Sequence, residues 1–189
     1  MEKIPYLKDL GITAVELMPV TEFDEVMMSS SGNGFHDAKP EPTGYINYWG
    51  YGPSYLYTVK SAYASHGEMS AESEFKTLVK ELHRAGIECI PELYFTGKEL
   101  PGEIVSVLRY WVEEYHVDGF HLLGFPNLLL AAEDPFLKRT KLFAENWNEV
   151  MDRRPKKGYI TPGDGPVSVA EKNLAEYNMQ FMEDMRRFL

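Results

Sequence analysis

Side chains that could transfer protons or bind hydroxyl groups stand at or near the ends of short apolar segments of this sequence. They are Glu16, Glu92, His121 and Glu145. A histidine in such a position is a candidate base, and a carboxylate is a candidate acid or hydroxyl ligand. For His121 a structural role is the simpler interpretation, because Leu122 and Leu123 follow it and the local sequence holds no carboxylate.

The spacing of the other histidines does not indicate a metal site. No two of them stand at the separation of a metal-binding motif, and no cysteine joins them in one. Cys89 is the only cysteine, which excludes a disulfide within the chain. The sequence therefore predicts no metal and no cofactor.

The apolar segments alternate with helical patterns along the chain. Strands are predicted at 13–20, 87–95, 117–123 and 140–145, and helices at 70–86, 104–115, 126–138 and 174–188. Residues 21–69 lack strong periodicity and are predicted as a long loop. The alternation predicts an α/β fold with a parallel sheet of about four strands flanked by helices. Such folds place their chemistry at the carboxyl ends of the strands.

Composition excludes several classes of protein. The chain has 189 residues, with 19 Lys and Arg against 29 Asp and Glu, for a net charge of −10. Such an acidic chain is a poor ligand for nucleic acid or an anionic membrane. No apolar run reaches the ~20 residues of a membrane helix and the N-terminus is not a signal peptide, so we expect a cytoplasmic location. The length falls short of the ~250 residues of a complete (β/α)8 barrel.

Six stretches, in order, carry a resemblance to a known protein family. They are 4–20, Asn47-Tyr48-Trp49-Gly50-Tyr51, 74–88, 108–120, Lys141-Leu142-Phe143-Ala144-Glu145-Asn146-Trp147 and 174–188. Together they resemble the α-amylase family of glycoside hydrolases, in its branch of isoamylases, pullulanases and glycogen debranching enzymes. The resemblance implies one partial (β/α)8 TIM-barrel-like domain over 1–189. The first strand would precede residue 1, and strands six to eight would follow residue 189.

The resemblance also assigns catalytic positions. Retaining hydrolysis uses two carboxyl groups about 5–5.5 Å apart, one as nucleophile and one as general acid. The family's general acid corresponds to Glu145, but its nucleophilic Asp corresponds to Leu123, and the Arg before it corresponds to His121. The third-strand Asp corresponds to Glu92, and a third carboxylate would lie beyond the chain. Because leucine cannot form the glycosyl-enzyme, we expect this chain alone to have no glycosidase activity.

Candidate substrate contacts follow from the same resemblance. Tyr51 corresponds to the family tyrosine that stacks on a sugar ring, and Glu92, His121 and Trp147 are further candidates. The alternative for Tyr51 is packing of its loop against neighbouring aromatic residues, which are Tyr45, Tyr48, Trp49, Tyr55 and Tyr57.

Three functions remain open at this point. The chain could be a degenerate α-amylase-family domain that retains α-glucan binding, a piece of an active hydrolase completed by other segments, or a structural and oligomerisation module without affinity for sugar. Half a barrel would expose unpaired strand edges, which invite association. We therefore expect a homo-oligomer, or the rest of a larger chain, to cover the sheet edges, with an α-glucan as the candidate ligand.

Overall fold

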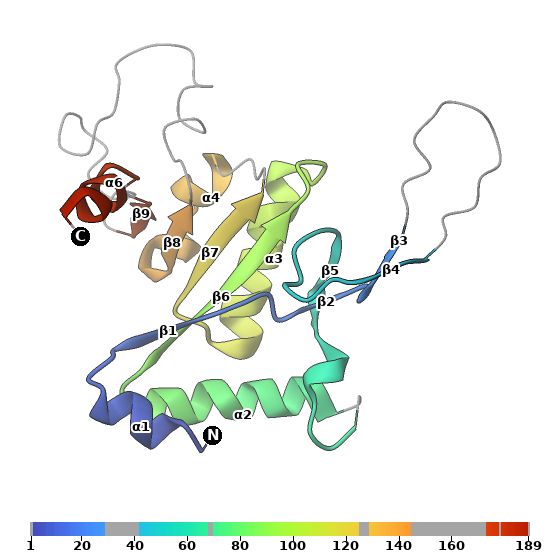
Figure 1. The fold of residues 1–189 in the computed structure, drawn as a ribbon, viewed down its shortest axis with the longest axis horizontal. Coiled ribbons are helices and arrows are strands. Elements are labelled where there is room, and N and C mark those ends of the chain that lie inside the picture. Colours follow the sequence, from blue (N-terminus) through green and yellow to red (C-terminus); the bar gives the residue numbers. More distant parts are fainter. Residues whose placement is uncertain are drawn as a thin grey trace, which may run out of the picture.

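A parallel sheet of five strands forms the centre of the chain (Figure 1). The computed structural model describes residues 2–28, 42–67, 70–124, 129–144, 173–177 and 179–188. In spatial order the strands are β1 (Ala14–Leu17), β6 (Glu88–Phe95), β7 (Gly119–Gly124), β8 (Lys141–Ala144) and β9 (Leu174–Glu176). All neighbouring pairs are parallel, which confirms the predicted α/β class. Among the described residues β1 and β9 are the two edges, so the sheet is not closed into a barrel.

Glycine and proline mark ends of the helices between the strands. α2 (Ala71–Arg84) buries Phe75, Val79 and Leu82 on one stripe, and Gly86 follows it with a φ of 75°. α3 (Pro101–Tyr115) begins with a proline, whose fixed φ suits a first helical turn. The remaining helical segments are α1 (Ile4–Asp9), η1 (Ser61–Tyr63), α4 (Leu129–Glu133), η3 (Phe136–Arg139) and α6 (Met179–Phe188).

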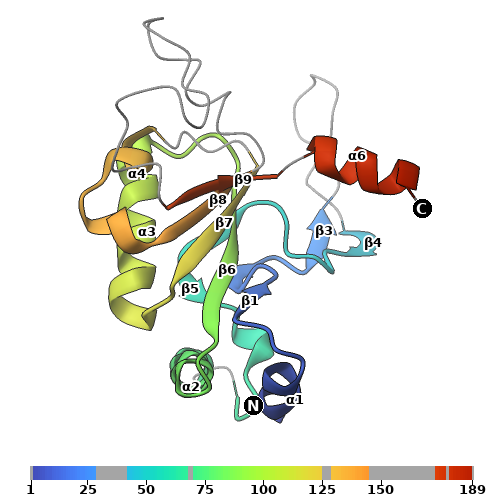
Figure 2. The same ribbon diagram turned by 90° about the vertical axis from the view of Figure 1, so that its left-hand side faces the viewer.

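The two faces of the sheet differ in chemistry. Figure 2 shows α3 and α4 on one side of the sheet, which we call the outer face, and α6 on the other. Alternate residues of the strands, among them Leu93, Phe120 and Leu142, are fully buried in one core with Trp111 of α3. The intervening residues, such as Glu92 and His121, lie on the opposite inner face. The helices thus stabilise the outer face and leave the inner face for polar side chains.

The segment 21–69, expected as a long loop, contains short strands where the structure describes it. β2 (Thr21–Phe23) pairs antiparallel with β5 (Ser54–Val59), and β3 (Val26–Met28) pairs antiparallel with β4 (Pro42–Ile46). Both pairings contain register shifts, and three of the four strands have five residues or fewer. Such short, irregular strands produce no clear alternation of apolar and polar residues, so the expectation of a plain loop was wrong.

The end of the chain also differs from the expected single helix over 174–188. Leu174 begins strand β9, which pairs parallel with β8, and Tyr177 lies between β9 and α6. The sheet therefore has one strand more than the four predicted. The expected helix at 126–138 is divided into α4 and η3, with residues 125–128 outside the described part of the chain.

A buried lysine directly after β5 binds the strand β2 and the turn that follows it. The Lys60 side chain is almost fully buried, and its Nζ lies 2.6 Å from Glu22 Oε1 and 3.0 Å from Glu25 Oε1. The N–H and hydroxyl of Ser61 donate to Glu22 Oε2 at 2.8 and 2.6 Å. Burial alone would raise the pKa of Glu22, but the hydrogen bonds from Lys60 and Ser61 outweigh it and lower that pKa to about 2.

We expect Glu22→Gln to reduce the free energy of unfolding at neutral pH by about 2 kcal/mol, because the buried Lys60 loses a charged partner. The folded-state pKa of Glu22 is depressed, so its contribution is present above the ordinary value of 4.5 and is lost as the pH falls towards about 2. Urea unfolding across this pH range should therefore show the wild type and variant converging in acid.

Glu25→Gln is the matched control, since Glu25 contacts the same Lys60 but is half exposed. It should cost less than about 1 kcal/mol. An equal loss in the free energy of unfolding in the two variants would contradict this role of Glu22. So would a difference between Glu22→Gln and the wild type that does not change with pH.

Candidate functional site

Three ionisable side chains meet on the inner face, at neighbouring strands of the sheet. Glu16 comes from β1, Glu92 from β6 and His121 from β7, and we call these three residues the acid–histidine cluster. His121 Nδ1 lies 2.6 Å from Glu16 Oε1 and 3.9 Å from Glu92 Oε1. The register pairs Glu92 directly with His121, so parallel pairing places these two side chains at the same level.

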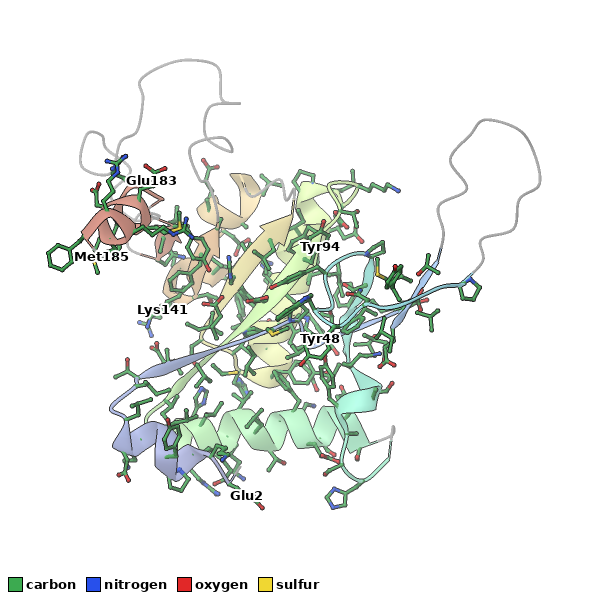
Figure 3. The ribbon with its side chains drawn as sticks, viewed as in Figure 1. Glu2, Tyr48, Tyr94, Lys141, Glu183 and Met185 are labelled. Atoms are coloured by element: carbon green, nitrogen blue, oxygen red, sulfur yellow. The ribbon has the colours of Figure 1, made fainter. Side chains whose placement is uncertain are left out.

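Aromatic residues surround the acid–histidine cluster. The Tyr51 hydroxyl donates a hydrogen bond of 2.9 Å to Glu92 Oε2, and its ring centroid lies 6.1 Å from that of Tyr94. On the other side, the Tyr177 hydroxyl is 3.4 Å from His121 Nδ1 and its ring centroid is 5.0 Å from the imidazole. Figure 3 shows Tyr94 towards the carboxyl end of β6 and Lys141 at the opposite end of the sheet. Tyr94 follows Glu92 by two residues on β6, so the aromatic contacts extend from the acid–histidine cluster towards the carboxyl edge.

Local backbone structure positions Tyr51. Gly50 has a φ of 77°, and a Cβ there would come within 2.7 Å of the Phe23 ring. Asn47 accepts a hydrogen bond from Gly50 N–H and donates one to the Tyr51 carbonyl, each at 3.1 Å. The asparagine and the glycine together fold the loop so that the Tyr51 hydroxyl reaches Glu92.

Burial and neighbouring charge perturb the acid–histidine cluster. Glu92 is only 9% exposed, and burial raises its pKa. The neighbouring Glu16 carboxylate raises this pKa further, whereas the Tyr51 hydrogen bond and the His121 charge lower it without cancelling the rise. Burial, followed by the hydrogen bond to Glu92, raises the pKa of Tyr51 to about 12. Its phenol therefore stays protonated and acts as a donor near neutral pH.

His121 is the least exposed member of the acid–histidine cluster. It is 4% exposed, and its Nε2 has no hydrogen-bond partner among the described residues. A structural role for His121 was favoured because the local sequence holds no carboxylate, but the sheet brings Glu16 and Glu92 to it from strands distant in the sequence. These groups can share a proton, bind a hydroxyl group or bind a cation.

Leu123 follows His121 by two residues on β7. Because successive side chains of a strand point to opposite faces, Leu123 lies on the same inner face as His121. It pairs in register with Tyr94 of β6 and is only partly buried. The position that the resemblance assigns to the nucleophile thus carries an aliphatic side chain beside the acid–histidine cluster. Nucleophilic attack by a carboxylate cannot occur from this position.

The structure brings together three of the predicted site residues, Tyr51, Glu92 and His121. Glu145 and Trp147 lie outside the described residues. Tyr94 and Tyr177 were not predicted as site residues, and Glu16 was noted only for its place near a strand end. The alternative that Tyr51 and its neighbours form a packed core does not fit the structure, since Tyr51 is 41% exposed and the others are exposed as well: Tyr45, Tyr48, Trp49, Tyr55 and Tyr57.

We expect Tyr51→Phe to lower the free energy of unfolding by about 1 kcal/mol, because it leaves the buried Glu92 oxygen without its donor. Urea denaturation at neutral pH would measure the change. The control is Tyr55→Phe, which removes the hydroxyl of an exposed tyrosine on β5 and should change stability by less than about 0.5 kcal/mol. Equal effects of the two variants would show that the Glu92 contact does not stabilise the fold.

Comparisons with known proteins place these features in context. The chain is 30% identical over 257 aligned positions to the chloroplastic isoamylase 3 of Oryza sativa subsp. japonica, covering all of this chain and 30% of that protein. It is also 30% identical over 245 positions to the glycogen debranching enzyme of Serratia proteamaculans, covering 98% of this chain and 33% of that protein. The chain thus spans about a third of the length of these curated relatives.

Solved structures share the fold at lower identity. The catalytic module of the glycogen-degrading pneumococcal virulence factor SpuA matches with a TM-score of 0.57 and 19% identity, over 94% of this chain and 31% of that one. A pullulanase from Paenibacillus barengoltzii matches with a TM-score of 0.50 and 17% identity, over 76% of this chain and 28% of that one. These likenesses confirm a partial TIM-barrel fold.

No family model matches the chain. The similarity of the chain to about a third of an isoamylase and of a glycogen debranching enzyme nevertheless agrees with the resemblance carried by the sequence motifs. The likeness to SpuA and the pullulanase agrees with the fold that the resemblance implies. The chain is therefore related to the α-amylase family, in its branch of isoamylases, pullulanases and glycogen debranching enzymes.

Proposed function

We propose that this chain is a degenerate α-amylase-family domain that binds α-glucan and has no glycosidase activity alone. The observation that carries this proposal is Leu123 on the inner face of β7, at the position that the resemblance assigns to the nucleophile. Supplying further strands from another segment would not restore that carboxylate. Loss of a nucleophile costs about 10⁶-fold in the rate of one well-studied hydrolase.

Sugar binding is supported by the aromatic side chains near the carboxyl edge. The Tyr51 ring is partly exposed while its hydroxyl is anchored to Glu92, so the ring is held in place with a face available for a ligand. The C–H groups of a pyranose ring pack on such aromatic faces. Glu92 and His121 add polar groups within reach of the same surface, and Trp147 is a further candidate from the resemblance.

The edges of the sheet support a protein partner as well. β1, at one edge of the sheet, has one side without a strand partner in the described part of the chain. Unpaired strand edges associate readily, so a second copy of this chain or a further segment of a larger protein would pair with them. Light scattering over a range of protein concentrations would test the homo-oligomer, and a monodisperse monomer throughout would exclude it.

Activity and binding can be tested separately on the purified chain. Pullulan, glycogen and maltooligosaccharides should all remain uncleaved. Turnover that persists through repurification and disappears in Glu145→Gln would contradict the proposed inactivity and favour a working hydrolase.

Binding can be measured by calorimetry with maltoheptaose and by affinity electrophoresis with glycogen. Tyr51→Ala should weaken binding about tenfold or more, as expected for removal of a central aromatic contact. Tyr6→Ala is the matched control, because Tyr6 is an exposed tyrosine on α1, far from the carboxyl edge (Figure 1). No binding at millimolar sugar would favour a structural module, and equal effects of the two variants would contradict the proposed location.

A further inference from the structure

We propose that Glu16, Glu92 and His121 form a binding site for a divalent transition-metal ion, with Zn²⁺ and Mn²⁺ as the best candidates. Each residue offers one ligand atom, and these atoms all lie within 4.8 Å of one another. They come from three adjacent strands, β1, β6 and β7, which fix the backbone of each ligand. This inference goes beyond glucan binding and does not depend on it.

The spacing of the donor atoms fits a metal ion after small movements. With metal–ligand bonds of about 2.0–2.1 Å, a tetrahedral centre separates neighbouring donors by about 3.3 Å. The distances from His121 Nδ1 are 2.6 Å to Glu16 Oε1 and 3.9 Å to Glu92 Oε1, one below and one above that value. The Glu16 side chain is 44% exposed and can move outward to open the shorter distance.

The charge of the acid–histidine cluster favours a cation. Among the described residues, the ion pairs of Glu16 and Glu92 go to His121 alone. An imidazole, unlike a guanidinium, can lose its charge at neutral pH, and the neutral ring is the commonest protein ligand for transition metals. A divalent ion would neutralise the two carboxylates without requiring a charged histidine. Imidazole and carboxylate donors together suit Zn²⁺ and Mn²⁺.

Outer contacts orient the proposed ligands. The Tyr51 hydroxyl donates to Glu92 Oε2, while Glu92 Oε1 is the oxygen that faces His121 Nδ1. Such contacts to a metal-binding carboxylate are typical of metal sites. His121 is almost fully buried, and Nδ1, the nitrogen aimed at both carboxylates, is the one that would bind the metal. The partly exposed Tyr177, with its hydroxyl 3.4 Å from Nδ1, marks the side open to solvent.

Titration calorimetry of the whole chain with Zn²⁺ and with Mn²⁺, after treatment with a chelator and without any sugar, tests the site. We expect one ion per chain. Co²⁺ should bind in the same place and give visible absorption bands from a site with nitrogen and oxygen ligands. Absence of binding at millimolar metal would overturn the proposal.

Glu16→Gln is the most informative variant, because Glu16 is exposed enough for the change to leave the fold intact. It should weaken binding by about 10- to 100-fold, and Tyr51→Phe should weaken it by about tenfold through Glu92. The matched control is His83→Gln, which alters a histidine paired with Asp118 at 2.8 Å outside the acid–histidine cluster. It should leave the affinity unchanged.

Thermal unfolding gives a second measurement that is independent of activity. Metal at a concentration that saturates the wild type should raise the melting temperature of the wild type more than that of Glu16→Gln, because stabilisation by a ligand grows with the ratio of its concentration to the Kd and the variant binds more weakly. Equal affinity in wild type and Glu16→Gln, or loss of binding in His83→Gln, would place the metal elsewhere and overturn the proposal. A chain that binds metal but not maltoheptaose would contradict only the proposed glucan function.

Discussion

The parallel register between β6 and β7 is the constraint on which the site depends. It sets Glu92 beside His121 and Tyr94 beside Leu123. The register therefore decides which side chains of the two strands are neighbours on the inner face. A slip of one residue would turn Glu92 and His121 towards the helices and bring Leu93 or Leu122 to the inner face. The full burial of Phe120, Leu122 and Leu93 against α3 opposes that slip, since apolar packing on the outer face specifies the register. Apolar packing on the outer face therefore positions the acid–histidine cluster on the inner face, although the residues of the cluster take no part in that packing.

The same division of the sheet explains why the inner face tolerates charge. Helices α2 and α3 bury the outer face, whereas the part of the chain that the structure describes leaves the sheet open rather than closed into a barrel. Glu16, on the edge strand, is partly exposed, while Glu92 and His121, on central strands, are buried. Burial thus increases from the edge towards the centre within a single cluster, and Glu16 is the member with most freedom to move towards a ligand.

Most of the sheet could be predicted from the sequence because its central strands are continuous apolar runs between amphipathic helices. β6 and β8 lie within the predicted segments, and β7 extends one residue beyond its predicted segment, to Gly124. β9 was missed because Leu174, Tyr177 and Phe181 also fit a helical spacing, and only pairing with β8 distinguishes the two interpretations. The ribbon strands were missed because they are short and their pairing has register shifts, so tertiary contacts rather than local pattern define them.

The site was predictable only where a motif marked it. Glu92 and His121 stood out because each occupies a family motif position, and Tyr51 because of its aromatic loop. The contact between His121 and Glu16 joins residues 105 positions apart, and no local pattern encodes such a contact. Spacing along the chain cannot reveal the proposed metal ligands for the same reason, since the three donor atoms come from three different strands.

Two residues that depart from the family pattern lie side by side on the inner face. Glu92 is one methylene longer than the aspartate that the resemblance places there, and His121 is shorter than the corresponding arginine, yet the two remain 3.9 Å apart. Glu16 makes the closer contact with the histidine, at 2.6 Å. Burying carboxylates costs free energy unless they gain partners, and replacing such groups by apolar residues of similar size is often neutral or stabilising. Leu123 shows that this inner face accepts an aliphatic side chain, so the presence of two carboxylates and a histidine beside it favours a binding role for the acid–histidine cluster over a purely structural one.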